Sequence, residues 1–130
     1  MVTFRGSATR RQGHAAELRM AGYLAARGLE VLAQGVERAG AEIDLIAVDR
    51  RHGTPEIVFV EVRTRADATR GLPLETVDRA KQRQIRRAAT AWLVEQELWE
   101  QVAVRFDVVG AVRTPTGWRV SWIEDAFGVD

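Results

Sequence analysis

The chain has 130 residues, of which 46% are hydrophobic and 28% charged, and its formal net charge is only +1. These proportions are typical of one globular domain, and they exclude a disordered chain or a polycation. The absence of cysteine excludes disulfides and thiolate zinc sites, and it fits a reducing compartment. No apolar run has the length of a signal peptide or of the roughly 20 residues of a membrane span, so we expect a cytoplasmic protein without membrane contact.

The chain is expected to begin with a flexible basic arm at residues 1–10, followed by a single domain at residues 11–130. The first predicted element of this domain is a helix at 11–27. Its apolar residues recur at helical spacing until Gly28, which favours a stop.

Five strands and a second helix are predicted after this point, from β-branched runs, turn residues and helical periodicity. We expect strands at 30–37, 42–48 and 56–64, a loop at 65–73, a long helix at 76–96, and strands at 102–112 and 118–123. Short links make the first three strands an antiparallel meander. The long helix can carry the chain across the sheet, so that the fourth strand lies parallel to the third. The predicted fold is an α/β sandwich around a mixed sheet.

Two acidic residues interrupt strands that otherwise read as buried. Asp44 lies in "EIDLI" and Glu61 lies in "VFVEVRTR". Burying an unpaired carboxylate costs on the order of several kcal/mol. Side chains alternate along a strand, so Asp44 shares a face with Glu42, and Glu61 shares a face with Arg63 and Arg65. A hairpin between the two strands brings Asp44 and Glu61 near each other.

The helices are expected to bring further charges to the same sheet. Glu17 shares a helical stripe with Met20 and Leu24, which should face the sheet. Lys81 shares a stripe with Ile85 and therefore points inward or to the edge of the core. The second helix also carries four arginines that are predicted to lie on its solvated sides: Arg79, Arg83, Arg86 and Arg87.

This set of charges has two interpretations. Glu61 with Arg63, or Asp44 with Lys81, could form structural ion pairs at the edge of the sheet. The alternative is a divalent-metal site, because magnesium prefers carboxylate, carbonyl and water oxygens. Its ligands would be Asp44, Glu61 and the backbone carbonyl of Val62. The convergence of three acids and two cations on one sheet favours the metal site.

Several stretches of the chain carry a family resemblance. An acid on one strand and Glu-x-Lys on the next, within an α-β-β-β-α-β core, is the pattern of the PD-(D/E)xK nuclease superfamily, which includes restriction endonucleases and archaeal Holliday-junction resolvases. The chain resembles this pattern, and it is more closely similar to the YraN-like bacterial family. The matching stretches span Gly13 to Phe127 and include "GHAAELRMAGYLAARG", "GAEIDLIAVD", "VFVEVRTR" and "VRFDVVG". The resemblance implies a restriction endonuclease-like core, with a mixed sheet flanked by helices in the order α-β-β-β-α-β-β.

The resemblance also implies roles for individual residues. Glu17 matches the helix acid, while Asp44 and Glu61 match the two metal-binding acids. Arg63 stands where the superfamily motif has lysine. Arginine can fork a phosphate and stabilise its charge, but it stays protonated and cannot act as a base. Lys81 is the candidate to compensate for this departure.

The expected function is Mg²⁺- or Mn²⁺-dependent hydrolysis of phosphodiester bonds in DNA, including branched or structured DNA. The arginines expected to contact phosphates are Arg65, Arg79, Arg83, Arg86 and Arg87. Two alternatives stay open: a nucleic-acid-binding module whose site has degenerated, and a structural or assembly protein that uses the same fold. A homodimer is also left open.

The aromatic residues and histidines carry weaker signals. Trp92, Trp99, Trp118 and Trp122 are interpreted as core or edge packing rather than as base-stacking residues. His14 and His52 are far apart in the sequence and are interpreted as surface residues.

Overall fold

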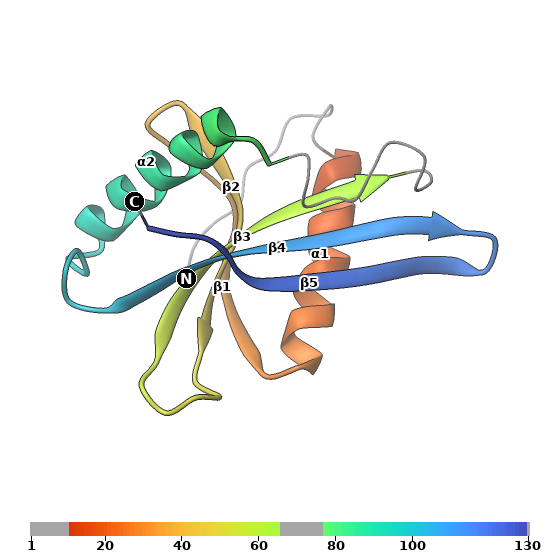
Figure 1. The fold of residues 1–130 in the computed structure, drawn as a ribbon, viewed down its shortest axis with the longest axis horizontal. Helices are drawn as coiled ribbons and strands as arrows, with labels where there is room; N and C mark the ends of the chain where they lie inside the picture. The colour runs from red at the N-terminus through yellow and green to blue at the C-terminus, as the bar shows by residue number, and fades with distance from the viewer. Residues whose placement is uncertain (1–10, 66–76, 130) are drawn as a thin grey trace.

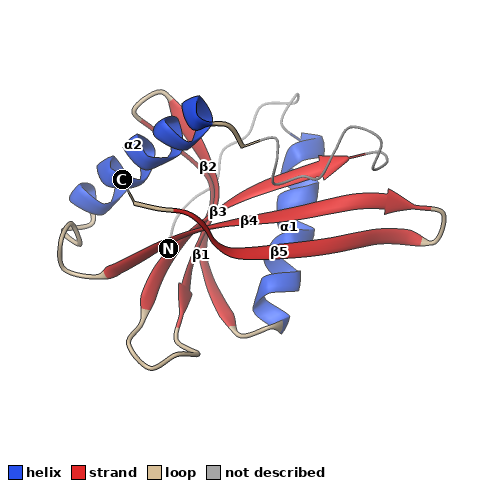
Figure 2. Cartoon of the chain, in the orientation of Figure 1, coloured by secondary structure: helices blue, strands red, loops and turns tan. Residues whose placement is uncertain are grey.

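The computed structural model describes residues 11–65 and 77–129, with side chains from residue 15 onward in the first range. The predicted arm at 1–10 and most of the predicted loop at 65–73 lie outside the described residues. The elements are α1 (Arg11–Ala26), β1 (Leu29–Arg38), β2 (Ala41–Asp49), β3 (Glu56–Arg65), α2 (Arg79–Glu95), β4 (Ala103–Thr114) and β5 (Gly117–Phe127). Their order confirms the predicted α/β arrangement (Figures 1 and 2).

The five strands form one open sheet in the order β1-β2-β3-β4-β5. β1 pairs antiparallel with β2, β2 with β3, and β4 with β5. β3 and β4 are parallel, as the length of the intervening helix predicted. α2 therefore serves as the crossover connection between the only two parallel neighbours of this sheet.

Two boundaries differ from the prediction by three residues or more, and the others differ by no more than two. α2 begins at Arg79 rather than at residue 76, because Asp78 is the N-cap and its side chain accepts a hydrogen bond from the Lys81 N–H at 2.8 Å. β5 continues to Phe127 rather than ending at residue 123. A register shift opposite Phe106/Val108, together with a positive φ at Asp125, lets the strand resume pairing at Phe127.

One helix packs on each face of the sheet. The cluster on the α1 face joins Met20 and Leu24 to Leu45, Val58 and Val60. The cluster on the α2 face is built from alternate residues of the same strands, including Ile46, Val48, Ile57, Phe59 and Val108, with Ile85 and Trp92 of the helix. The period-two alternation of the strands thus divides the core into two halves.

The helices leave part of the sheet uncovered. α2 packs mainly against β1 and β2, and α1 packs against β1, β2 and β3. β4 and β5 form a long hairpin whose tip extends past both helices, at the right of Figure 1. Among the described residues, neither helix has the length and apolar character needed to cross a membrane.

Candidate metal and nuclease-like site

The site begins where the β2–β3 ladder ends. The paired residues run from Asp49 opposite Glu56 to Leu45 opposite Val60. The next residues along are Asp44 and Glu61. At this point the Asp44 side chain, and not its backbone, bonds to β3, because its Oδ2 accepts a hydrogen bond from the Val62 N–H at 2.7 Å. This contact fixes the Asp44 carboxyl beside β3.

Asp44 and Glu61 meet, as strand alternation and the hairpin predicted. Their carboxyl groups lie close enough for each to shift the pKa of the other. Two neighbouring carboxyl groups in a buried site favour a state in which one of them holds a proton. Burial raises the pKa of Asp44 to about 6. Burial, followed by the neighbouring Asp44, raises the pKa of Glu61 to about 8. The pair therefore holds a proton near neutral pH and titrates as a unit.

Two cationic side chains contact Glu61. Arg63 places a terminal guanidinium nitrogen 2.9 Å from Glu61 Oε2. Lys81 reaches the same oxygen from α2, with its Nζ at 3.7 Å. Glu61 itself is only 5% exposed, and both cations lower its pKa against the larger effect of burial. Lys81 thus points inward as expected, but it pairs with Glu61, whereas one structural interpretation paired it with Asp44.

Glu17 reaches the same place from the opposite face of the sheet. Its side chain is buried on α1, and its carboxylate is close to those of Asp44 and Glu42, with one oxygen of each lying within 4.8 Å of the others. Burial, and then the charge of Glu42, raises the pKa of Glu17 to about 7. The end of the β2–β3 ladder is therefore where side chains from both layers converge.

Glu42 is a member of this group that the sequence interpretation placed on the right face but did not assign to the site. It lies two residues before Asp44 on β2 and is half-buried. The signal was the strand alternation itself, which puts residues i and i+2 on one side. The prediction followed the superfamily pattern of two strand acids and left this third one out.

The donor set suits a hard divalent cation. Glu17, Asp44 and Glu61 all have raised pKa values, and Glu42 adds a fourth carboxylate. Oxygen ligands of this kind are those that Mg²⁺ and Mn²⁺ prefer. A cation would stabilise the ionised forms of Glu17, Asp44 and Glu61, which burial and mutual repulsion now disfavour. The Val62 carbonyl as a further ligand stays a prediction.

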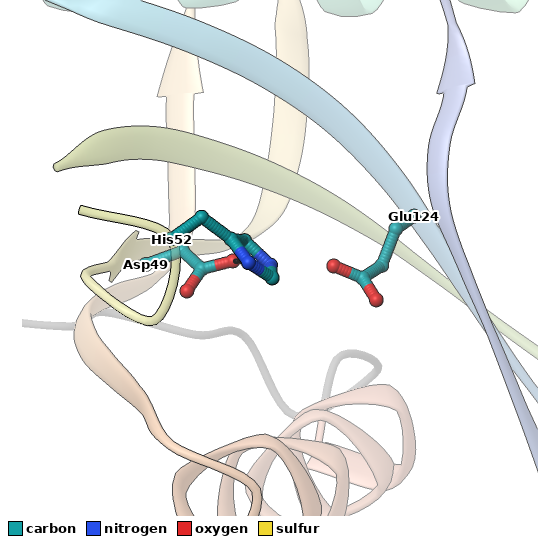
Figure 3. Close-up of side chains that lie close together, drawn as sticks. All are labelled: Asp49, His52 and Glu124. Atoms are coloured by element: carbon teal, nitrogen blue, oxygen red, sulfur yellow. Dashed lines mark ion pairs between the residues drawn. The ribbon is translucent and has the colours of Figure 1, made fainter. Parts of the chain in front are cut away.

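A second group of possible metal ligands, two acids and a histidine, lies at the other end of the β2–β3 ladder. Asp49 and His52, at the β2–β3 turn, face Glu124 of β5, and the three have ligand atoms within 4.8 Å of one another (Figure 3). The side chain of Asp49 is fully buried, while His52 is exposed, as its surface interpretation predicted. This geometry alone would also suggest a metal site.

Arginines already occupy the oxygens of that second group. Arg51 binds Asp49 through both carboxylate oxygens, with nitrogen–oxygen distances of 2.9 and 2.8 Å, and Arg105 adds a contact to Oδ2 at 2.9 Å. Arg51 also reaches Glu124 at 2.6 Å. The fork of Arg51 holds the pKa of Asp49 well below its usual range. A cation would have to displace two guanidinium groups, so we interpret this group as a structural ion-pair network.

The same network extends into β4 through a buried pair that the sequence interpretation missed. Arg105 forks Asp107 with distances of 2.8 and 2.9 Å. The two oxygens of Asp107 also accept hydrogen bonds from the Asp125 N–H and the Trp122 indole N–H, each at 2.9 Å. All four acceptor positions of this carboxylate are filled. The network thus anchors β5 against β4 and the β2–β3 turn.

The arginines of α2 separate into two kinds. Arg79, Arg83 and Arg87 are exposed, as predicted. Arg86 is half-buried, which corrects the expectation that it lies on a solvated side. Its Nε donates to the Gly128 carbonyl at 2.9 Å, and its guanidinium lies over the Phe127 ring at 5.4 Å. The C-terminal residues cover it, and helical spacing alone carries no information about that cover.

The tryptophans are also not equivalent. Trp92 is buried in the core, and Trp122 is half-buried with its indole bonded to Asp107, so the packing interpretation holds for both. Trp99 is 46% exposed. It lines a pocket of about 410 Å³ between α2, β4 and the C-terminal residues, whose other lining residues include Leu93, Val104 and Phe106. This pocket contains none of the clustered acids.

Comparison with known proteins places the chain in a family. The model of the uncharacterised protein family UPF0102 matches residues 16–111, a span that includes Glu17, Asp44, Glu61 and Lys81. A UPF0102 protein of Chromohalobacter salexigens is 42% identical over 119 residues, which cover 92% of each chain. A UPF0102 protein of Halorhodospira halophila is 40% identical over 118 residues, covering 91% of this chain and 88% of the relative. These matches agree with the resemblance to the YraN-like bacterial family, and the chain belongs to the uncharacterised protein family UPF0102.

Proposed function

We propose that this protein is a metal-dependent endonuclease that hydrolyses phosphodiester bonds in DNA. The observation that carries the proposal is the pairing of Asp44 with the buried Glu61 at the end of the β2–β3 ladder, where their pKa values are raised to about 6 and about 8. A structural ion pair would lower the pKa of an acid, as the arginines do for Asp49. Acids whose surroundings disfavour ionisation are more typical of a functional site than of a structural ion pair.

Asp44 and Glu61 would hold Mg²⁺ or Mn²⁺, with Glu17 and Glu42 beside them. Such an ion, when bound, supplies Lewis-acid polarisation of the phosphate and lowers the pKa of a bound water. The proton shared by Asp44 and Glu61 must leave before both carboxylates can bind a cation, so metal binding releases protons. Burial of Glu61 keeps bulk water from competing for its oxygens.

Arg63 and Lys81 would act on the phosphate and not on the metal. Both already lie within ion-pair distance of Glu61 Oε2, and both are partly exposed, so their remaining donors can reach a phosphate. Their charge would stabilise the negative charge that develops on the phosphate oxygens. Arg63 cannot take up a proton, so it serves as an electrostatic group and not as a base.

DNA cleavage tests the proposal directly. The purified protein is incubated with linear, flapped and four-way-junction DNA, in Mg²⁺, in Mn²⁺ and in EDTA. We expect metal-dependent cleavage that Asp44→Asn abolishes. Glu95→Gln is the matched control, since Glu95 is an exposed acid that pairs with Arg38 on the surface. Cleavage of none of the substrates by the wild type in either metal would overturn the proposal.

A binding module with a degenerate site is the second candidate. The observation that favours it is the Arg63–Glu61 contact at 2.9 Å, because a bound guanidinium occupies a carboxylate that a metal would need. This candidate predicts salt-dependent DNA binding without cleavage and without metal binding. Metal titration of the wild type therefore separates the two functions even where both bind DNA.

A further inference from the structure

The α2-side face of β3, β4 and β5 carries a row of arginines that leads away from Glu61. Arg63 and Arg65 follow Glu61 on the same face of β3, because alternate residues share a face. The sheet register places Arg65 opposite Val112 of β4, and Val112 opposite Arg119 of β5. Arg65 and Arg119 therefore occupy one row across three strands, about 10 Å apart at the backbone.

Among the described residues, the surface between these arginines is formed by small side chains. The row that contains Arg63 continues through Gly110 to Ser121, two residues with little or no side chain. Ser121 and Arg119 are exposed. α2 packs mainly on β1 and β2, so its body lies toward the other edge of this face. In the part of the chain that the structure describes, the row through Gly110 and Ser121 therefore offers a ligand a path across β4 that is free of bulky side chains.

The charge on this surface has one sign. After Glu61, the described part of β3 contains arginine but no acid, and β4 and β5 have no acid between Val108 and Ile123. The ion pairs found among the described residues leave Arg65 and Arg119 without a carboxylate partner. The Nε groups of Arg63 and Arg65 are buried without a hydrogen-bond partner in the described structure. The outer guanidinium nitrogens of these partly exposed arginines are the donors that a ligand phosphate would meet.

We propose that Arg63, Arg65 and Arg119 form a phosphate track that holds a continuous nucleic-acid strand beside the acidic site. Successive arginines on β3 are about 7 Å apart, and the row to Arg119 extends the track by about 10 Å, so the three span a few nucleotides. A mononucleotide is too short to reach all three. This inference deepens the proposed function and rests on it for the position of the scissile phosphate. Arg119 enters as a new substrate-binding residue.

The test uses a matched pair of variants on one hairpin. Arg119→Gln removes the distal end of the track. Arg113→Gln is the control, because Arg113 lies on the other face of the same hairpin, over the Trp118 ring at 5.3 Å. Both residues are exposed, so we expect equal melting temperatures for the two variants. Binding is measured by fluorescence anisotropy in EDTA, with labelled single-stranded DNA and with the matched duplex, over a series of salt concentrations.

We expect Arg119→Gln to weaken binding several-fold at low salt. Its slope of log affinity against log salt should be shallower by about 0.7 for single strands or about 0.9 for duplex. Arg113→Gln should keep the wild-type slope. Equal slopes for the two variants would overturn the track. Competition by polyglutamate as effective as that by DNA would also overturn it, in favour of an acidic protein partner.

The outcomes also separate this inference from the proposed function. Metal-dependent cleavage with an unchanged slope for Arg119→Gln would retain the nuclease and remove the track. A reduced slope for Arg119→Gln in a protein that cleaves no DNA would retain the track and remove the nuclease. The binding measurement needs neither metal nor turnover. Its result therefore does not depend on whether the protein cleaves DNA.

Discussion

Asp44 Oδ2 accepts the Val62 N–H at 2.7 Å, at the point where the backbone ladder between β2 and β3 has ended. This contact lowers the pKa of Asp44, but burial outweighs it, and the pKa still rises to about 6. The hydrogen bond therefore positions the carboxyl without making it easy to ionise. A group that is held in place and yet ionises at a cost is well suited to binding a cation.

Metal binding to the folded protein should raise its melting temperature. We expect Mn²⁺ to stabilise the wild type and to have little effect on Asp44→Asn combined with Glu61→Gln, since a ligand stabilises only the state that binds it. Differential scanning fluorimetry over a Mn²⁺ titration measures this difference. Glu95→Gln serves again as the control and should shift like the wild type. The same shift in the double variant would place the metal elsewhere.

The stability of the metal-free protein should fall as the pH rises from about 4 to about 8. The folded pKa values of Asp44, Glu17 and Glu61 are about 6, 7 and 8, all above the ordinary values near 4. The folded state therefore binds protons more tightly than the unfolded state. Its advantage is complete below about pH 4 and is lost as the pH passes the folded values. The loss should be on the order of a few kcal/mol for this coupled group.

The variant Asp44→Asn with Glu61→Gln tests that assignment. It removes two of the three groups, so its stability should change less than that of the wild type over the same pH range. Urea denaturation in EDTA at several pH values gives the unfolding free energies directly. Parallel pH dependences for the two proteins would mean that these carboxyls titrate normally in the folded state.

The contribution of the Arg105 network to stability should depend on pH in the opposite sense. Arg105 forks Asp107 and also contacts Asp49, and the side chains of all three are buried or nearly so. Replacing Arg105 with Leu leaves two buried carboxylates without this partner, which should cost about 3–5 kcal/mol. The lowered pKa of Asp49 means that its contribution is present above pH 4 and is lost in acid.

Urea denaturation at pH 7 measures the cost of Arg105→Leu. The control is Arg38→Leu, which breaks an exposed pair with Glu95 and should cost no more than about 1 kcal/mol. Similar losses for the two variants would contradict the structural role of the network. Metal binding at Asp44 and Glu61 should survive in any Arg105→Leu protein that still folds, because the network lies at the other end of the ladder.

The topology and the main acids could be predicted because both depend on local rules. Short links favour antiparallel neighbours, a long helix permits a parallel one, and alternation sets which side chains share a face. Asp44, Glu61 and Lys81 were found in this way. The same rule applied to "VRFDVVG" identifies Asp107 as a further buried acid.

The partners of those acids depend on long-range contacts that local rules do not reach. Arg105 meets Asp49 across 56 positions of the chain, and Arg51 meets Glu124 across 73. The two arginines beside Asp49 outweigh its burial and lower its pKa, whereas burial and the neighbouring Asp44 outweigh Arg63 and Lys81 and raise the pKa of Glu61. The pattern of acids is therefore readable from sequence, whereas the distinction between a structural and a functional acid needs the fold.

Arg63 gives the sharpest test of the chemistry, because it stands where the superfamily pattern has lysine. If this position must release a proton during turnover, Arg63→Lys should raise the cleavage rate. If it only stabilises charge, Arg63→Lys should leave the rate level or lower it, and Arg63→Ala should abolish cleavage. We expect the second outcome. A guanidinium that contacts Glu61 at 2.9 Å has further donors for a phosphate oxygen, and a lysine has a single nitrogen for both.

A readout other than cleavage separates this role from a structural one. Arg63 lowers the pKa of Glu61, so Arg63→Ala should raise that pKa further and make Mn²⁺ binding at neutral pH more dependent on pH. Arg63→Lys should restore most of the wild-type dependence, because the positive charge returns. Isothermal titration with Mn²⁺ at two pH values measures both effects. Cleavage by Arg63→Ala at the wild-type rate, with unchanged Mn²⁺ binding, would remove Arg63 from the mechanism and leave Lys81 as the cation that serves the site.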